Sequence, residues 1–327
     1  MINRINTIML LRLGHFALIC CSTVATHAVT HDTVPIGNIG NLADSTGFGA
    51  VDIPFRISRY EVTNAQYAEF LNAVADTDTH VLYNTSMPST GITRSGNSGS
   101  FTYAVNSGRE EHPVVLVGFW DAVRYTNWLH NGQPSGAQGL STTEDGAYFL
   151  NGVTSPVNDT ISRDPNARWF IPSEDEWYKA AYHKNDGDTG NYWEYPTKSD
   201  FSPSAEAAPG TDLTNGSANY DSVVGDTTPV GAYTAKPSRS AYGTFDQGGN
   251  VSEWNETIGS ATSRVLRGGS YNLISDNLAA SRRQFTFPTV VSSVLGFRVA
   301  RIIPEPSALQ LGAIAGVGLL LHRRLTR

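Results

Sequence analysis

Cysteine is almost missing from this chain: Cys20 and Cys21 are the only cysteines among its 327 residues. The sequence after residue 21 therefore offers no disulfide, no thiol nucleophile and no thiolate ligand for a metal. Charged residues are also scarce, at 16%, and acidic residues outnumber basic ones by 30 to 23. This balance argues against binding to nucleic acid, because phosphates require a basic surface.

A long apolar run is missing as well, and the two shorter runs lie near the ends of the chain. Near the start, basic residues precede the apolar run 13–21, and small residues follow it up to Ala28. This order is typical of a secretory signal peptide over residues 1–28, cleaved after Ala25 or Ala28. A lipoprotein signal that uses one of the two cysteines, and an uncleaved membrane anchor, are the alternatives.

The second apolar run, 307–321, follows the tripeptide Pro-Glu-Pro at 304–306 and precedes a basic end. Its length of about 15 residues is marginal for a membrane span. The whole segment 304–327 resembles a PEP-CTERM sorting signal. That resemblance implies cleavage by an exosortase-type sorting protease at the inner membrane, and delivery to the surface or exterior of a Gram-negative bacterium. A permanent inner-membrane anchor through 307–321 is the alternative.

Three helices have recognisable positions in the sequence. Thr63 with Gln66, and Ser173 with Glu176, have the spacing of capping boxes at the starts of the first and third helix. The second helix is expected over 120–130, where apolar residues recur at helical spacing. The acidic residues next to Ser173 suit the first turn of a helix, so we expect them to be structural rather than catalytic.

Short apolar segments between these helices predict strands, and long polar stretches separate them. The expected strands are 53–60, 114–117, 147–150, 168–171, 230–233, 265–267 and 296–302. Scattered short elements with much irregular chain indicate one α+β domain of low secondary-structure content over residues 33–303.

Six segments in a fixed order indicate the kind of domain. They are 60–67 (YEVTNAQY), 112–122 (HPVVLVGFWDA), 168–178 (RWFIPSEDEWY), 246–254 (DQGGNVSEW), 264–271 (RVLRGGSY) and 295–301 (LGFRVAR). Together they resemble the formylglycine-generating enzyme and sulfatase-modifying-factor family. The resemblance implies that family's α+β fold, which is related to C-type-lectin-like domains and has little regular secondary structure.

The chain departs from this family where the family's oxidases bind copper. In those oxidases two cysteines follow the Gly-Gly-Ser-Tyr segment, and by spacing Leu273 and Leu278 stand at the two positions here. Leucine cannot ligate a metal. We therefore expect no copper site, although the family itself is enzymatic.

A non-haem iron site is another metal-dependent alternative. It requires two histidines and a carboxylate that converge on one ion. The histidines of the domain interior are His80, His112, His130 and His183. None has the spacing of such a site, and we expect His112 in particular to be structural.

Calcium has better support from the residues. Asp246 and Glu253 bracket a glycine-rich turn, which offers the oxygen-only ligands that Ca²⁺ requires. The family resemblance implies a structural calcium here, bound by these two side chains and by the carbonyls of Gly249 and Val251. A capped turn without an ion is the alternative.

The resemblance also implies a second calcium, bound by Asn219, the carbonyl of Tyr220, Asp226 and the carbonyl of Thr228. The loop that joins these residues is shorter than in the oxidases, so a loop without an ion is the alternative. Calcium is thus the one cofactor that we expect.

Two functions of different classes follow. The first is an exported, non-catalytic, calcium-stabilised domain that binds an extracellular polysaccharide or protein. Aromatic residues in polar segments support it, because rings stack on sugars or fill protein pockets; they are Tyr83, Phe101, Tyr103, Tyr192, Trp193 and Tyr195. The alternative is an oxidase of the formylglycine-generating type, or a non-haem iron enzyme of the same family, that acts on a protein or small-molecule substrate.

Overall fold

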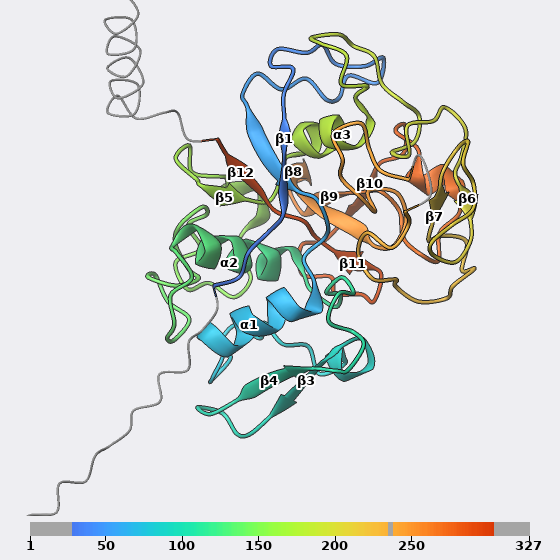
Figure 1. Cartoon of the computed structure of the whole chain (residues 1–327). Helices are drawn as coiled ribbons and strands as arrows, with labels where there is room; N and C mark the ends of the chain where they lie inside the picture. The colour runs from blue at the N-terminus through green and yellow to red at the C-terminus, as the bar shows by residue number, and fades with distance from the viewer. Residues whose placement is uncertain (1–27, 235–237, 304–327) are drawn as a thin grey trace, which may run out of the picture.

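The computed structural model describes residues 28–234 and 238–303. The expected sorting segment 304–327, and the expected signal peptide except Ala28, lie outside these residues. Within them, no helix has the length and apolar character needed to cross a membrane. Figure 1 shows short helices and strands joined by long irregular segments, as the sequence predicts for an α+β domain of low secondary-structure content.

The first sheet brings the two ends of the domain together. Its strand order is β1-β2-β12-β5, and all three pairs are antiparallel. The strands are Thr33–Ile36 (β1), Phe55–Ser58 (β2), Ala300–Ile302 (β12) and Trp169–Phe170 (β5). Ser58, the last residue of β2, and Val62 donate backbone hydrogen bonds to the carbonyls of Val299 and Phe297, at 2.8 and 2.9 Å. The chain before β12 therefore runs next to the chain after β2.

The second sheet has the order β10-β9-β8-β11. Its strands are Gln284–Thr286 (β10), Ser263–Arg267 (β9), Ser252–Ser260 (β8) and Leu295–Gly296 (β11). Glu253 on β8 stands opposite Arg267 on the antiparallel β9 and opposite Gly296 on the parallel β11. Two small sheets pair Ile92–Ser95 (β3) with Thr102–Val105 (β4), and Ser204–Ala205 (β6) with Ser217–Ala218 (β7).

The three expected helices are confirmed. They are Asn64–Val74 (α1), Phe119–His130 (α2) and Glu174–Tyr182 (α3), and single 3₁₀ turns lie at Met87–Ser89 (η1), Asn158–Thr160 (η2) and Ser275–Leu278 (η3). Thr63 caps α1 and Ser173 caps α3, each in a complete capping box with the residue three positions later. At the start of α2, the carboxylate of Asp121 accepts a hydrogen bond from the Gly118 N–H at 2.8 Å.

Two of the expected strands are wrong because their backbones turn. Segment 114–117 is interrupted at Leu116, whose φ of +62° is left-handed. Segment 230–233 is interrupted at Gly231, whose φ is +71°. A regular strand requires extended backbone, so neither segment forms one.

A third expected strand, 147–150, is wrong for a different reason. The buried amide of Asn127 on α2 donates to the carbonyl of Tyr148 and accepts from its N–H, both at 2.8 Å. A side chain thus satisfies the backbone groups that a neighbouring strand would otherwise pair. The other expected strand segments contain strands, although 168–171 is reduced to β5 and 296–302 is divided between β11 and β12.

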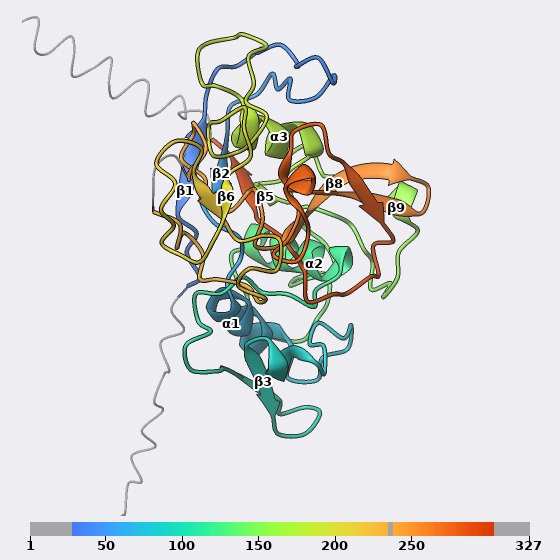
Figure 2. The same ribbon diagram turned by 90° about the vertical axis from the view of Figure 1, so that its right-hand side faces the viewer.

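The main core lies between the first two helices and the first sheet (Figures 1 and 2). Phe70 on α1 packs against Tyr125 and Trp128 on α2, with ring centroids 5.2 Å apart in both pairs. The ring of Phe297 adds to this cluster, with its centroid 5.4 Å from that of Tyr125. Burial of these rings fixes the chain on either side of Phe297, and Arg298 is the next residue.

Candidate functional site

The loop from Asp246 to Glu253 leads into β8 and has a turned backbone. Asp246, Gly249 and Asn250 have φ values of +61°, +88° and +58°, in the left-handed region that Gly, Asn and Asp tolerate best. A Cβ on Gly249 would lie 2.4 Å from the carbonyl oxygen of Asn219, so only glycine fits there. The same carbonyl accepts a hydrogen bond from the Asn250 N–H at 2.8 Å, which holds the loop in place.

Glu253, at the end of this loop, is completely buried and paired with Arg298. The guanidinium donates from Nε to Oε2 at 2.6 Å and from Nη2 to Oε1 at 2.7 Å. The indole N–H of Trp177 on α3 donates to Oε2 at 2.7 Å. Arg298 also donates to the backbone carbonyls of Ser58, Arg59 and Phe245, so this single side chain ties together β2, the loop and β8.

Two further carboxylates lie next to this ion pair. Asp246 accepts a hydrogen bond from the Gly231 N–H at 2.6 Å, and burial raises the pKa of Asp246 to about 6. Glu61 is 1% exposed; its Oε1 accepts from the Asn250 amide at 3.1 Å, whereas its Oε2 has no hydrogen-bond partner. Burial first, and the Asp246 carboxylate second, raise the pKa of Glu61 well above its usual value.

Glu61, Asp246 and Glu253 with Arg298 are called the Arg298 cluster below. It places three carboxylates against one guanidinium in an environment that excludes water. Such an excess of negative charge is costly unless protons or a cation offset it. Sequence analysis identified Asp246 and Glu253 but missed Glu61 and Arg298, although both lie in segments, 60–67 and 295–301, that carry the family resemblance.

The donor set of the Arg298 cluster fits a hard cation. The described residues contain no group of three or more His, Cys, Asp or Glu side chains placed to hold a metal ion. An ion here would therefore use two carboxylates together with backbone or water oxygens, which Ca²⁺ accepts. The unpartnered Glu61 oxygen and the excess of negative charge suit such an ion. Glu253 suits it less, because both of its oxygens already accept hydrogen bonds from Arg298.

At the second expected calcium site, Asn219 and Asp226 differ in whether their oxygens are already paired. The Oδ1 atom of Asn219 is buried without a partner, and its amide nitrogen donates to the backbone carbonyl of Asp226 at 2.8 Å. The Asp226 carboxylate, however, accepts hydrogen bonds from Arg109 on both oxygens, at 3.0 and 3.3 Å. It is also more than half exposed. The charge of Asp226 is thus balanced by Arg109, and an ion would have to compete with this pair.

The two positions that correspond to the copper ligands, Leu273 and Leu278, lie in a turned segment that includes η3. Leu278 is completely buried and packs against Ala218 and Tyr220. Leu273 is half-buried, and its backbone N–H donates to the carbonyl of Ser270 at 3.0 Å. Neither side chain carries an atom that can ligate a metal.

Two of the histidines, His112 and His183, are hydrogen-bonded to neighbouring hydroxyl groups. His112 lies 3.0 Å from the hydroxyl of Thr227, and His183 lies 2.9 Å from the hydroxyl of Tyr242. Burial lowers the pKa of both imidazoles, which favours their neutral forms. This arrangement agrees with the structural role that the sequence suggests for His112.

The aromatic residues of the long polar segments include a buried pair and two half-exposed rings, each beside a cation. Tyr83 and Tyr103 are buried, with their ring centroids 5.5 Å apart, and they anchor loops on the core. Trp193 and Phe101 are half-exposed, and the cations of Lys184 and Arg94 lie 4.0 and 4.2 Å from their ring centres.

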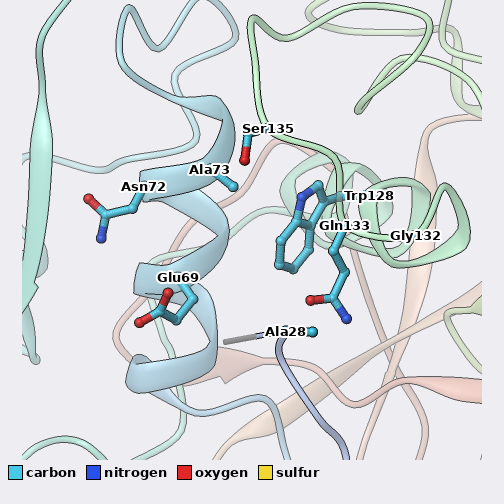
Figure 3. A pocket seen from close by; sticks show the side chains of 8 residues that line it. All are labelled: Ala28, Glu69, Asn72, Ala73, Trp128, Gly132, Gln133 and Ser135. Carbon is cyan, nitrogen blue, oxygen red and sulfur yellow. The ribbon is translucent and has the colours of Figure 1, made fainter. Parts of the chain in front are cut away.

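A surface pocket of about 280 Å³ lies between α1 and the turn that follows α2 (Figure 3). Glu69 and Asn72 line it from α1, and Trp128 and Gln133 line it from the opposite side. The Gln133 amide accepts from the N–H of Val29 at 2.6 Å and donates to its carbonyl at 2.8 Å. The pocket therefore borders the start of the domain and not the Asp246–Glu253 loop.

Sequence comparison finds similarity to known proteins. The chain is 27% identical over 267 residues to the serine/threonine-protein kinase Pkn1 of Chlamydia trachomatis, and the alignment covers 76% of this chain and 33% of Pkn1. It thus spans about a third of the length of that relative. It is 25% identical over 272 residues to the formylglycine-generating enzyme of Streptomyces coelicolor, which covers 76% of this chain and 78% of that enzyme.

Among solved structures, the crystal structure of CarF aligns with a TM-score of 0.54 and 23% identity over 84% of this chain and 99% of CarF. The two proteins share a fold. The family model of the sulfatase-modifying factor enzyme 1-like domain matches residues 48–303, nearly all of the part that the structure describes. The chain therefore belongs to the FGE-sulfatase family of sulfatase-modifying factor enzyme 1-like domains.

Proposed function

We propose that this chain is an exported, non-catalytic binding domain of the FGE-sulfatase family, stabilised by calcium. The chemistry of positions 273 and 278 carries the proposal. Both are leucine, one of them buried in an apolar cluster, and residues 22–327 contain no cysteine that could supply a thiolate elsewhere. Cu(I) sites depend on such soft ligands. Copper-dependent oxidation of a substrate cysteine therefore has no ligand set in this chain.

The match to Pkn1 supports a role as a module. The shared region makes up 33% of that protein, so a domain of this family occurs there as one part of a longer chain. Our proposal assigns the present chain a recognition role, with an extracellular polysaccharide or protein as its partner. The exposed loops of a C-type-lectin-like arrangement would provide the contact surface. Cosedimentation with matrix polysaccharide purified from the producing cells tests this partner class, and a negative result leaves a protein as the partner.

Calcium is proposed at the Asp246–Glu253 loop, with Asp246 as its first carboxylate ligand. A turn of left-handed residues places this carboxylate in the Arg298 cluster, next to the Glu253–Arg298 pair, where negative charge is in excess. An ion that binds only the folded protein raises its stability by mass action, by about 2.7 kcal/mol when calcium is at a hundredfold excess over its Kd. Removing calcium should therefore lower the melting temperature, and Asp246→Ala should abolish the difference.

An activity assay tests the non-catalytic role directly. The mature chain is incubated with copper, oxygen and a cysteine-containing sulfatase peptide, and the product is analysed by mass spectrometry. The Streptomyces coelicolor formylglycine-generating enzyme provides the positive control. We expect no formylglycine above the level without protein. Formylglycine formation that scales with the concentration of the chain would refute the proposal.

Export is proposed from the two end segments, 1–28 and 304–327, through cleavage of the first by a signal peptidase and of the second by an exosortase-type protease. Mature protein from the producing cells should then begin after Ala25 or Ala28 and end near Pro306. Mass spectrometry of the purified protein measures both ends. Intact Arg327 in inner-membrane fractions would indicate a permanent anchor through 307–321 instead.

A further inference from the structure

Glu61 is the least satisfied charged group among the described residues. Its Oε2 is the only buried carboxylate oxygen there without a hydrogen-bond partner. The backbone around it is fixed, because Val62 donates to the carbonyl of Phe297 at 2.9 Å and accepts from the Val114 N–H at 2.8 Å. These contacts hold the backbone that carries Glu61, and the residue is 1% exposed. Native structures rarely leave a buried polar atom in this state, and a missing ion is one of the usual reasons.

The backbone places Glu61 beside Asp246. Phe245 donates a hydrogen bond to the carbonyl of Arg59 at 2.8 Å, and the rings of Tyr60 and Phe245 pack with centroids 5.7 Å apart. The segment 59–61 thus runs along the residues that open the loop. The Asn250 amide, which donates to Glu61 Oε1 at 3.1 Å, closes the arrangement from the other end of the turn.

A pocket of about 240 Å³ connects Glu61 with the surface. Three carboxylates line it, those of Asp32, Glu61 and Glu111, and its lining contains no lysine or arginine. Asp32 is paired with Arg59 at 2.7 Å, whereas Glu111 is exposed. Burial lowers the pKa of His31, which also lines the pocket, to about 3, so this imidazole is neutral at pH 7. The pocket is therefore electrostatically suited to admit a cation.

We propose that Glu61 and Asp246 together bind one divalent cation, calcium, which enters through the pocket lined by Glu61 and Glu111. Glu61 then supplies the second carboxylate of the site, and Glu253 remains the partner of Arg298. This inference rests on the proposed calcium binding and identifies its ligands. Oxygen donors alone select a hard ion such as Ca²⁺ over copper or zinc, which prefer nitrogen and sulfur ligands.

The experiment compares four forms of the mature chain after metal removal: wild type, Glu61→Gln, Glu111→Gln and Asp246→Ala. Each is melted in calcium and in chelator, and Tb³⁺ is titrated as a luminescent substitute for Ca²⁺, excited through nearby tyrosines. Glu61→Gln keeps the side-chain shape and the oxygen that accepts from Asn250, but removes the charge. Glu111→Gln makes the same chemical change at the exposed rim of the same pocket.

We expect calcium to raise the melting temperature of wild type and of Glu111→Gln, with affinities within about threefold of each other, because exposed charges are screened. Glu61→Gln should bind at least about tenfold more weakly, because the number of charged ligands sets calcium affinity. An unchanged calcium response in Glu61→Gln, together with its loss in Asp246→Ala, would overturn the role of Glu61 and leave the proposed calcium binding intact.

Two other outcomes are decisive as well. If wild type melts at the same temperature in calcium and in chelator and binds no Tb³⁺, both the inference and the proposed calcium binding fail. If Glu61→Gln does not fold, Glu61→Asp replaces it, since this variant keeps the charge but shortens the reach by one methylene. It should bind Tb³⁺ at least about tenfold more weakly than wild type, and an equal affinity would overturn the inference.

Discussion

Two buried ionic clusters meet at the second sheet, and their charges are balanced in different ways. Glu253 on β8 and Arg267 on β9 stand directly opposite each other, a position where opposite charges often pair across strands. Each instead pairs elsewhere, Glu253 with Arg298 and Arg267 with Glu174, both at 2.6 Å. The two clusters therefore consist of separate ion pairs, although Glu253 and Arg267 lie on adjacent strands.

The Glu174 cluster is fully satisfied. Glu174 accepts hydrogen bonds from Arg267 and from Arg283, and no buried side-chain atom of these residues lacks a partner. Arg267 also donates to the backbone carbonyl of Ala280 at 2.8 Å. The side chain of Arg283 is 29% exposed, so water solvates the excess positive charge. This cluster needs no further ion.

The Arg298 cluster has the opposite balance, with three carboxylates, one guanidinium and no comparable exposure of the arginine. A buried pair that is fully hydrogen-bonded fixes the geometry of the chain, whereas a buried excess of one sign requires a counter-charge. The comparison therefore separates a structural ion cluster from a candidate ion-binding site, although the same residue types build both.

The largest expected effect comes from removing one arginine from each cluster. Arg298→Met leaves Glu253 buried without a cation, and such a loss costs about 3–5 kcal/mol of unfolding free energy. Arg283→Met leaves Glu174 paired with Arg267 and removes a partly exposed partner, so we expect a loss of about 1 kcal/mol. Urea unfolding followed by circular dichroism measures both. Equal losses in the two variants would contradict the difference between the clusters.

A smaller effect compares the glutamates of the two clusters, because their loss should change the unfolding free energy differently. In chelator, Glu174→Gln removes charged acceptors from two arginines and should lower the unfolding free energy by about 1.5–3 kcal/mol. Glu61→Gln removes an uncompensated charge, so in chelator it should leave stability within about 0.5 kcal/mol of wild type or raise it. Both free energies come from the same urea titration. A loss in Glu61→Gln as large as that in Glu174→Gln would mean that the Glu61 charge is compensated without an ion.

The sequence predicts the local parts of this fold well. The capping boxes at Thr63 and Ser173 depend on residues three positions apart, and both form as expected. The six segments that carry the family resemblance lie between residues 60 and 301, within the range 48–303 that the family model matches. Local chemistry and motif order therefore suffice for the helices and for the kind of fold.

The strands and the site depend on contacts that local sequence does not contain. Segment 147–150 does not form the expected strand because the amide of Asn127 binds the backbone of Tyr148. Asn127 lies on α2, 21 residues earlier in the sequence but adjacent in space. Glu61 belongs to the site because Arg298, far along the chain, bridges the carbonyl of Arg59 to Glu253. Periodicity gives no signal for such pairings, since burial of a glutamate depends on which distant segment covers it.

The smallest effect tests whether the two clusters act independently. Ser173 caps α3, the helix that carries both Glu174 and Trp177, and its hydroxyl accepts from the Glu176 N–H at 3.2 Å. Ser173→Ala should cost about 1 kcal/mol, the usual value of an N-cap. Thr63→Ala, which removes the cap of α1, provides a matched control of similar cost.

The informative quantity for Ser173→Ala is its calcium response. The Glu174 cluster needs no ion, and Glu61 and Asp246 are held by hydrogen bonds from Asn250 and Gly231 rather than by α3. The variant should therefore melt at a lower temperature than wild type in both calcium and chelator, with an unchanged difference between the two. If the difference disappears, the indole of Trp177, which donates to Glu253, transmits the position of α3 to the ion site, and the two clusters form one unit.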